Sequence, residues 1–180
     1  PAYTQTYPFA EERGVAYNLP ITEVDSATVK ATFRILNTQG QTIKDVLLPQ
    51  GALLSAEGHA RPWRYSGGMF SLRNGVYLDT NGLVRLTLGE QIPELVDAFD
   101  FRDERALVLV QKDDEIRAGF IDPMGQLIIP ARYEPIEDGF SEGLACVGWQ
   151  GHAGYIDRQG KWAITPTYDL AHSFSERLAA

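Results

Sequence analysis

The chain has 180 residues and a formal net charge of −8 at pH 7, with 44 % hydrophobic and 22 % charged residues. Residues 1–90 carry eight acids and eight bases, so the whole excess of acids lies in residues 91–180. This composition predicts a folded domain rather than disorder, disfavours nucleic acid and anionic membrane surfaces as partners, and contains no apolar stretch long enough to insert into a membrane.

The first 74 residues contain isolated copies of two short elements that recur later in the chain. Phe9–Gly14 (FAEERG) is a copy of the first, which we call the Phe element, and Ile35–Gly40 (ILNTQG) is a copy of the second, a turn element. Phe70–Leu72 (FSL) is interpreted as a degenerate Phe element. Polar and apolar residues alternate over Ala27–Leu36, which predicts a β-strand there.

Residues 75–117 form a degenerate repeat. Tyr77–Gly82 (YLDTNG) is a turn element and Phe101–Ala106 (FRDERA) is a Phe element. Glu94–Phe99, which follows Pro93, is compatible with a single helical turn. No window shows a sustained helical periodicity, so the predicted fold class is all-β.

Residues 118–180 contain the most regular repeats. Gly119–Gly125 (GFIDPMG) returns 35 residues later as Gly154–Gly160 (GYIDRQG). Phe140–Ala145 (FSEGLA) returns as Phe174–Ala179 (FSERLA). So many matches at nearly one spacing indicate a repeat architecture.

Each repeat is predicted to consist of three short antiparallel strands joined by hairpin turns. An apolar strand ends in Asp or Asn, and two residues and a glycine then reverse the chain. The second strand is expected to end at Pro130 or Pro166, and the third to run through Gly143–Trp149. We expect such units to stack like a solenoid or a partial propeller, as one continuous domain from a longer array, with three parts: residues 1–74, 75–117 and 118–180.

The repeat resembles a known family. The pattern Gly-Tyr-Ile-Asp-x-x-Gly, followed by Pro-x-Tyr and Phe-Ser-Glu-Gly-Leu-Ala, resembles the WG repeats of bacterial proteins, clearly over residues 118–180 and weakly over 75–117. That family is named for a Trp-Gly pair, but Ala118-Gly119 and Ala153-Gly154 stand at those positions here. The resemblance implies a β-repeat array that serves as an interaction module and has no catalytic residues.

The densest negative region is a candidate docking face. Its acids occupy two stretches that together comprise Asp97, Asp100, Asp103, Glu104, Asp113, Asp114 and Glu115. Neither stretch has the ligand order of an EF-hand, and carboxylate spacing alone does not identify a glycosidase. Solvated turns explain most of these acids, and an acidic docking face or a weak cation site is the alternative.

Two tryptophans are candidate binding residues because neither recurs at its equivalent repeat position. Trp149 and Trp162 are either core substitutions or exposed aromatics that stack on a sugar or anchor a partner. Exposure of both, side by side, favours a carbohydrate-binding module, and burial of both excludes it.

One motif is typical of serine hydrolases. Gly139–Gly143 matches Gly-x-Ser-x-Gly, with Ser141 as the nucleophile, but that motif needs a helix after it and no helical pattern follows. The equivalent Ser175 lacks both flanking glycines, which favours a turn hydroxyl. The three histidines, His59, His152 and His172, are interpreted as surface residues rather than metal ligands.

We therefore predict a non-catalytic β-repeat module that binds a protein, with a carbohydrate or cell-wall module as the first alternative and a Ser141 hydrolase as the second. No cofactor and no metal site is expected. The single cysteine, Cys146, excludes an internal disulfide and is compatible with either a reducing or an oxidising compartment.

Overall fold

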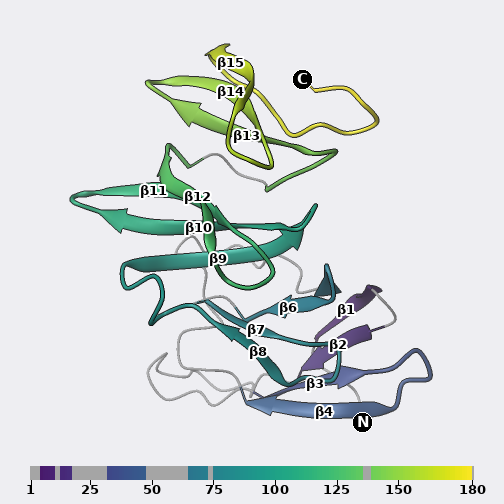
Figure 1. Ribbon diagram of the computed structural model, residues 1–180. Coiled ribbons are helices and arrows are strands. Elements are labelled where there is room, and N and C mark those ends of the chain that lie inside the picture. Colours follow the sequence, from purple (N-terminus) through teal and green to yellow (C-terminus); the bar gives the residue numbers. More distant parts are fainter. Residues whose placement is uncertain are drawn as a thin grey trace. The chain divides into compact units, whose positions relative to one another are not determined.

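The fold was determined as a computed structural model that describes residues 5–10, 13–17, 32–47, 65–72, 75–135 and 139–179. These residues contain fifteen strands and no helix (Figure 1), which confirms the predicted all-β class. The chain divides into two compact units, Pro1–Arg85 and Leu86–Ala180. In the part of the chain that is described, no helix is long and apolar enough to cross a membrane.

The first unit contains two antiparallel sheets. One has the order β1-β2-β3-β4 and comprises β1 (Gln5–Ala10), β2 (Arg13–Tyr17), β3 (Thr32–Leu36) and β4 (Thr42–Leu47). The other has the order β5-β6-β7-β8 and comprises β5 (Tyr65–Ser66), β6 (Met69–Ser71), β7 (Val76–Leu78) and β8 (Val84–Thr87), which ends just inside the second unit. Of the predicted strand at residues 27–36, positions 27–31 lie outside the described residues.

The second unit contains a four-stranded and a three-stranded antiparallel sheet. The first has the order β12-β11-β10-β9 and comprises β9 (Leu95–Arg102), β10 (Arg105–Lys112), β11 (Glu115–Ile121) and β12 (Leu127–Tyr133). The second comprises β13 (Leu144–Trp149), β14 (His152–Asp157) and β15 (Trp162–Tyr168). In Figure 1 the two sheets form successive layers of this unit, coloured teal to yellow.

All four sheets contain the same predicted turn. In each, the carboxyl or amide oxygen of an Asx residue accepts two backbone N–H bonds of 2.8–3.0 Å from the residues two and four positions later. The glycine that closes each turn has a φ of 74–82°, a conformation that glycine adopts without a steric penalty. These turns are centred on Asn37–Gly40, Asp79–Gly82, Asp122–Gly125 and Asp157–Gly160.

The Phe element forms a two-residue turn. Both central residues have positive φ at Asp103-Glu104, at Glu142-Gly143 and at Glu176-Arg177, the geometry that matches the twist of a tight hairpin. The equivalent turn of the β5–β6 hairpin is Gly67-Gly68, so the element there is Tyr65–Met69. The interpretation of Phe70–Leu72 as that copy is wrong, since Phe70 lies within β6 and a tyrosine replaces the phenylalanine.

The boundaries of the sheets do not coincide with the boundaries of the sequence repeats. The third strand of one sequence repeat, β13, pairs with β14, the first strand of the next. The same holds for β10, which follows the Phe element at residues 101–106 and pairs with β11. Both sheets of the second unit therefore contain the strand that follows a Phe element, and both end at the strand after the Asx turn.

Two local predictions need correction. Pro130 and Pro166 do not end their strands but lie inside β12 and β15, where the register shifts and no ladder donor is needed. The segment Glu94–Phe99 forms no helical turn, because residues from Leu95 onward pair with β10. The turns that do occur there lie earlier, where the amide of Ile92 donates to the carbonyl of Leu88.

The core of the second unit lies between its two sheets. One buried cluster takes residues from both, among them Phe120, Tyr133, Phe140 and Ile156. The rings of Phe120 and Phe140 meet edge to face at 4.9 Å, and those of Tyr155 and Phe174 repeat this contact at the same distance. These two Phe elements thus place their phenylalanines against the aromatic residue of the preceding Gly-aromatic-Ile-Asp strand.

Candidate binding groove

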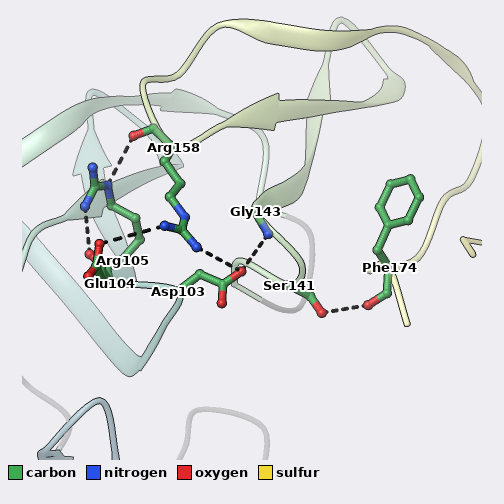
Figure 2. Close-up of polar contacts among 7 residues, drawn as sticks. All are labelled: Asp103, Glu104, Arg105, Ser141, Gly143, Arg158 and Phe174. Carbon is green, nitrogen blue, oxygen red and sulfur yellow. Dashed lines mark hydrogen bonds and ion pairs between the residues drawn. The ribbon is translucent and has the colours of Figure 1, made fainter. Parts of the chain in front are cut away.

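The acids of the β9–β10 turn hold one repeat to the next (Figure 2). The Asp103 carboxylate accepts a 2.6 Å hydrogen bond from the backbone N–H of Gly143. The Arg158 guanidinium lies 3.8 Å from both the Asp103 and the Glu104 carboxylates, and Arg105 donates to the carbonyl of Arg158 at 3.2 Å. Asp103 and Glu104 are therefore engaged within the protein.

The next boundary between repeats contains the same kind of hydrogen bond from a backbone N–H to a carboxylate. The Glu142 carboxylate accepts a 2.9 Å bond from the backbone N–H of Arg177, as Asp103 does from Gly143. In the first unit Arg13 donates to the carbonyl of Thr80 at 2.9 Å, which is the equivalent of the contact between Arg105 and Arg158. These contacts recur because the residues that make them recur in the sequence.

Ser141 belongs to this set of contacts. Its hydroxyl donates a 2.6 Å hydrogen bond to the carbonyl of Phe174 in the following Phe element (Figure 2). The chain then passes through the Glu142-Gly143 turn directly into β13. The Gly-x-Ser-x-Gly motif therefore lies in a strand–turn–strand segment, whereas a nucleophile elbow leads into a helix.

The acidic residues that were predicted as one region lie at different places in the sheet. Asp97 and Asp100 lie within β9, and the Asp97 carboxylate accepts a 2.7 Å bond from the N–H of Ala98. Asp103 and Glu104 lie at one end of β10, and the turn Asp113–Glu115 lies at its other end. Because β10 has eight residues, the two turns are about 23 Å apart, so these acids do not form one face.

The β10–β11 hairpin is longer than its counterpart in the next sheet. Its strands have eight and seven residues, against six each for β13 and β14. In the sequence, thirteen positions separate Ala106 from Gly119, but nine separate the equivalent Ala145 and Gly154. The four additional residues carry the acidic turn beyond the part of the hairpin that repeats.

A groove of about 560 Å³ lies beside this extension. It brings two separately predicted features together, the acidic turn Asp113–Glu115 and Trp149. Its lining comprises Lys112, Asp113, Asp114, Glu115, Arg117, Ala131, Arg132, Glu134, Trp149 and Gln150. No sequence motif marks Lys112, Arg117, Arg132 or Glu134, although the different spacing of the hairpin is a signal for this region.

Several charges of the groove already have partners. Arg117 pairs with Glu115 from the same strand. Arg132 donates a 2.9 Å bond to the Tyr133 hydroxyl, and its guanidinium lies 5.1 Å from the centre of the Tyr133 ring. Glu134 accepts from the N–H of Gly151 at 3.2 Å and bridges to Gly148 through its backbone, which fixes the groove wall.

The two tryptophans lie in one aromatic cluster. Their ring centres are 6.5 Å apart at an interplanar angle of 73°, and both contact Tyr133, at 6.0 Å for Trp149 and 5.6 Å for Trp162. Tyr133 is buried and Trp149 half-buried, whereas Trp162 is 37 % exposed. The rings are not coplanar, so they present two separate aromatic faces.

The remaining candidate residues lie elsewhere. His152 and His172 are exposed, and His59 lies outside the described residues. Cys146 is buried 3.4 Å from the carbonyl of Ala171, near Tyr155, whose pKa is raised mainly by burial. Among the residues that the structure describes, no group of three or more His, Cys, Asp or Glu is placed to hold a metal ion.

The comparisons with known proteins agree with the repeat contacts. A family model described as WG containing repeat matches residues 119–148 and 154–180. No curated protein and no solved structure matches the chain. The resemblance to WG repeats predicted from the sequence is therefore confirmed over these two segments.

Proposed function

We propose that this chain is a non-catalytic binding module that holds a segment of another protein in the groove beside Trp149. The observation that supports this proposal is the groove itself, which joins a half-buried indole to charged side chains on paired strands. A Trp in a partly buried pocket is the kind of anchor that dominates protein interfaces. The lining residues lie on hydrogen-bonded strands and the turns between them, so such a site forms without the entropy cost of ordering a long loop.

The charges suggest which segment fits. No other described side chain engages the Asp113 or Asp114 carboxylates, whereas Glu115 is paired with Arg117. A lysine or arginine of a partner would pair with the two unengaged carboxylates, and a neighbouring apolar side chain would contact Trp149. The proposed ligand is therefore a basic peptide segment with an adjacent apolar residue.

Peptide selection tests this proposal. A displayed random peptide library is selected on the wild-type chain, and the enriched peptides are titrated against the double variant Asp113→Asn/Asp114→Asn. We expect peptides with Lys or Arg beside an apolar residue, and a loss of affinity of about tenfold in the double variant. Glu90→Gln, an exposed charge change outside the groove, is the matched control. Enriched peptides that bind the double variant as tightly as the wild type would refute the groove as the binding site.

A carbohydrate-binding module is the second candidate, and the exposed indole of Trp162 favours it. A sugar ring would stack on that face, whereas the carboxylates of the acidic turn would contribute little. Binding to immobilised polysaccharides that is lost in Trp162→Ala but kept in Asp113→Asn/Asp114→Asn would support this candidate over the peptide. Peptide binding that is lost in Asp113→Asn/Asp114→Asn but kept in Trp162→Ala, with no binding to the polysaccharides, would support the peptide.

A further inference from the structure

The Asx turns have a second role, since each later turn rests on the repeat before it. A Cβ atom built at Gly82 would lie 2.7 Å from Ile35, one at Gly125 would lie 3.1 Å from Leu88, and one at Gly160 would lie 3.2 Å from Ile129. In all three cases the neighbour belongs to the preceding repeat. The glycine is needed for close approach between repeats as well as for the turn itself.

The first of these turns has the same geometry but no such neighbour. Gly40 has a φ of 76°, and Asn37 accepts the same two backbone bonds as its counterparts. No atom lies within 4 Å of a Cβ built at Gly40, and Thr38–Gln41 are exposed. We call the uncovered turn Asn37–Gly40 the head surface.

The last described repeat presents the complementary situation. On β12, Ile129, Ala131 and Tyr133 are each only 1 % exposed, and Ile129 and Tyr133 share a buried cluster with residues of β13 and β14. On β15 no described strand covers the equivalent face: Ile164 packs against the buried cluster of Cys146, Ala153, Tyr155 and Ala171 but is half-exposed, as is Pro166, and Tyr168 is 48 % exposed. We call Ile164, Pro166 and Tyr168 the tail surface.

The covered copy shows what fits the tail surface. The hydroxyl of Tyr133 donates a 3.2 Å bond to the carbonyl of Gly160, the glycine of the next Asx turn, while that glycine lies over Ile129. Tyr168 and Ile164 are the equivalents of Tyr133 and Ile129, and no described residue accepts a bond from the Tyr168 hydroxyl. The matching acceptor is an uncovered Asx turn with a glycine, which is what the head surface provides.

We propose that a second copy of this chain docks its head surface, Asn37–Gly40, on the tail surface of the first. Gly40 lies over Ile164, and the Tyr168 hydroxyl donates to the Gly40 carbonyl, as Tyr133 does to Gly160 within the chain. The two surfaces differ and each copy carries both, so the contact is heterologous and adds copies one after another. This inference is independent of the proposed function, because it involves none of the groove residues.

Sedimentation velocity over a wide concentration range tests the proposal. We expect the weight-average mass of the wild type to rise with concentration. Gly40→Asn should weaken the association at least about tenfold, because a side chain then occupies the space over Ile164, and asparagine tolerates the positive φ. Tyr168→Asp should do the same from the tail surface. Gly68→Asn is the matched control, since Gly68 also has a positive φ, 74°, and open space at its Cβ.

A mixture of the two variants tests whether the head surface binds the tail surface. Gly40→Asn keeps an intact tail and Tyr168→Asp an intact head, so an equimolar mixture should form dimers and nothing larger. Circular dichroism of each variant at low concentration checks that it is folded. A wild type that stays monomeric at every concentration, association that persists in both variants, or a mixture that forms no dimer would each overturn the proposal.

Discussion

Replacing Gly119 by alanine should strongly destabilise the second unit. A Cβ atom built at this position would lie 2.8 Å from the Ile129 carbonyl oxygen, 2.8 Å from the Ala131 backbone nitrogen and 2.9 Å from the Ala131 Cα. Ordinary contacts of a Cβ begin at 3.4 Å, so the backbone of the β12 bulge must move by about half an ångström. Overpacking in a core costs about 1–3 kcal/mol, and three backbone contacts at once place Gly119→Ala near the upper value.

Thermal unfolding followed by tryptophan fluorescence measures this effect, because two of the three tryptophans, Trp149 and Trp162, lie in the second unit. One kcal/mol shifts the midpoint of a domain of up to 100 residues by about 4–8 °C, so we expect a decrease of at least about 10 °C. Gly89→Ala is the control, because Gly89 has an ordinary φ and no atom within 4 Å of its Cβ position. A Gly119→Ala midpoint no lower than that of Gly89→Ala would refute the close-approach argument.

A second prediction concerns Gly154, the equivalent of Gly119 in the next sheet. A Cβ there meets Ile164 and Pro166 at 2.8 Å, a contact as short as at Gly119. However, β15 is uncovered on its other face and can move away, whereas Tyr133 ties β12 to the next repeat. We therefore expect Gly154→Ala to cost less than Gly119→Ala, and the opposite order would contradict the assignment of β15 as the freer strand.

Three further predictions concern polar contacts. Tyr133→Phe should lower the free energy of unfolding by about 1 kcal/mol in chemical denaturation, because it removes the bond to the Gly160 carbonyl, and Tyr168→Phe at the uncovered position should have no effect at low concentration. Glu142→Ala should accelerate amide hydrogen exchange at Arg177, whose N–H then loses its acceptor, without affecting the Asp103 contact. The hydrogen bond from Arg34 lowers the pKa of Asp45, so this pair stabilises the folded state above the ordinary pKa of 3.8 and loses that contribution as the pH falls below it. Both side chains are at least a third exposed, so Asp45→Asn should cost only about 0.2–1 kcal/mol at pH 7, and the difference from wild type should decrease as the pH falls below 3.8 and shrink in high salt.

The turns could be predicted from the sequence because their geometry is local. An Asx side chain that bonds the backbone two and four residues later requires only the spacing Asx-x-x-Gly, and all four predicted turns form. The sheet boundaries could not be predicted in the same way. The pairing of β13 with β14 joins two sequence repeats, and nothing in the spacing says which neighbours share a ladder.

Tertiary contacts explain the local errors. Glu94–Phe99 has residues compatible with a helical turn, but pairing with β10 provides more bonds than one turn can. Pro130 and Pro166 are tolerated inside strands because they fall where a bulge already interrupts the ladder. The sequence predicted Trp149 and the acidic turn as separate candidates but not the groove that they share. The two come together through the stacking of two sheets.

The repeat contacts also bear on where a ligand can bind. Residues that recur, such as Asp103, Ser141 and Tyr133, are engaged in holding one repeat to the next. A ligand that used recurring residues would find an equivalent site at each boundary and would bind with a stoichiometry above one per chain. The four-residue extension of the β10–β11 hairpin has no counterpart in the following sheet, so the groove predicts one ligand per chain in calorimetric titration. A stoichiometry of two or more would move the binding site to the repeated positions.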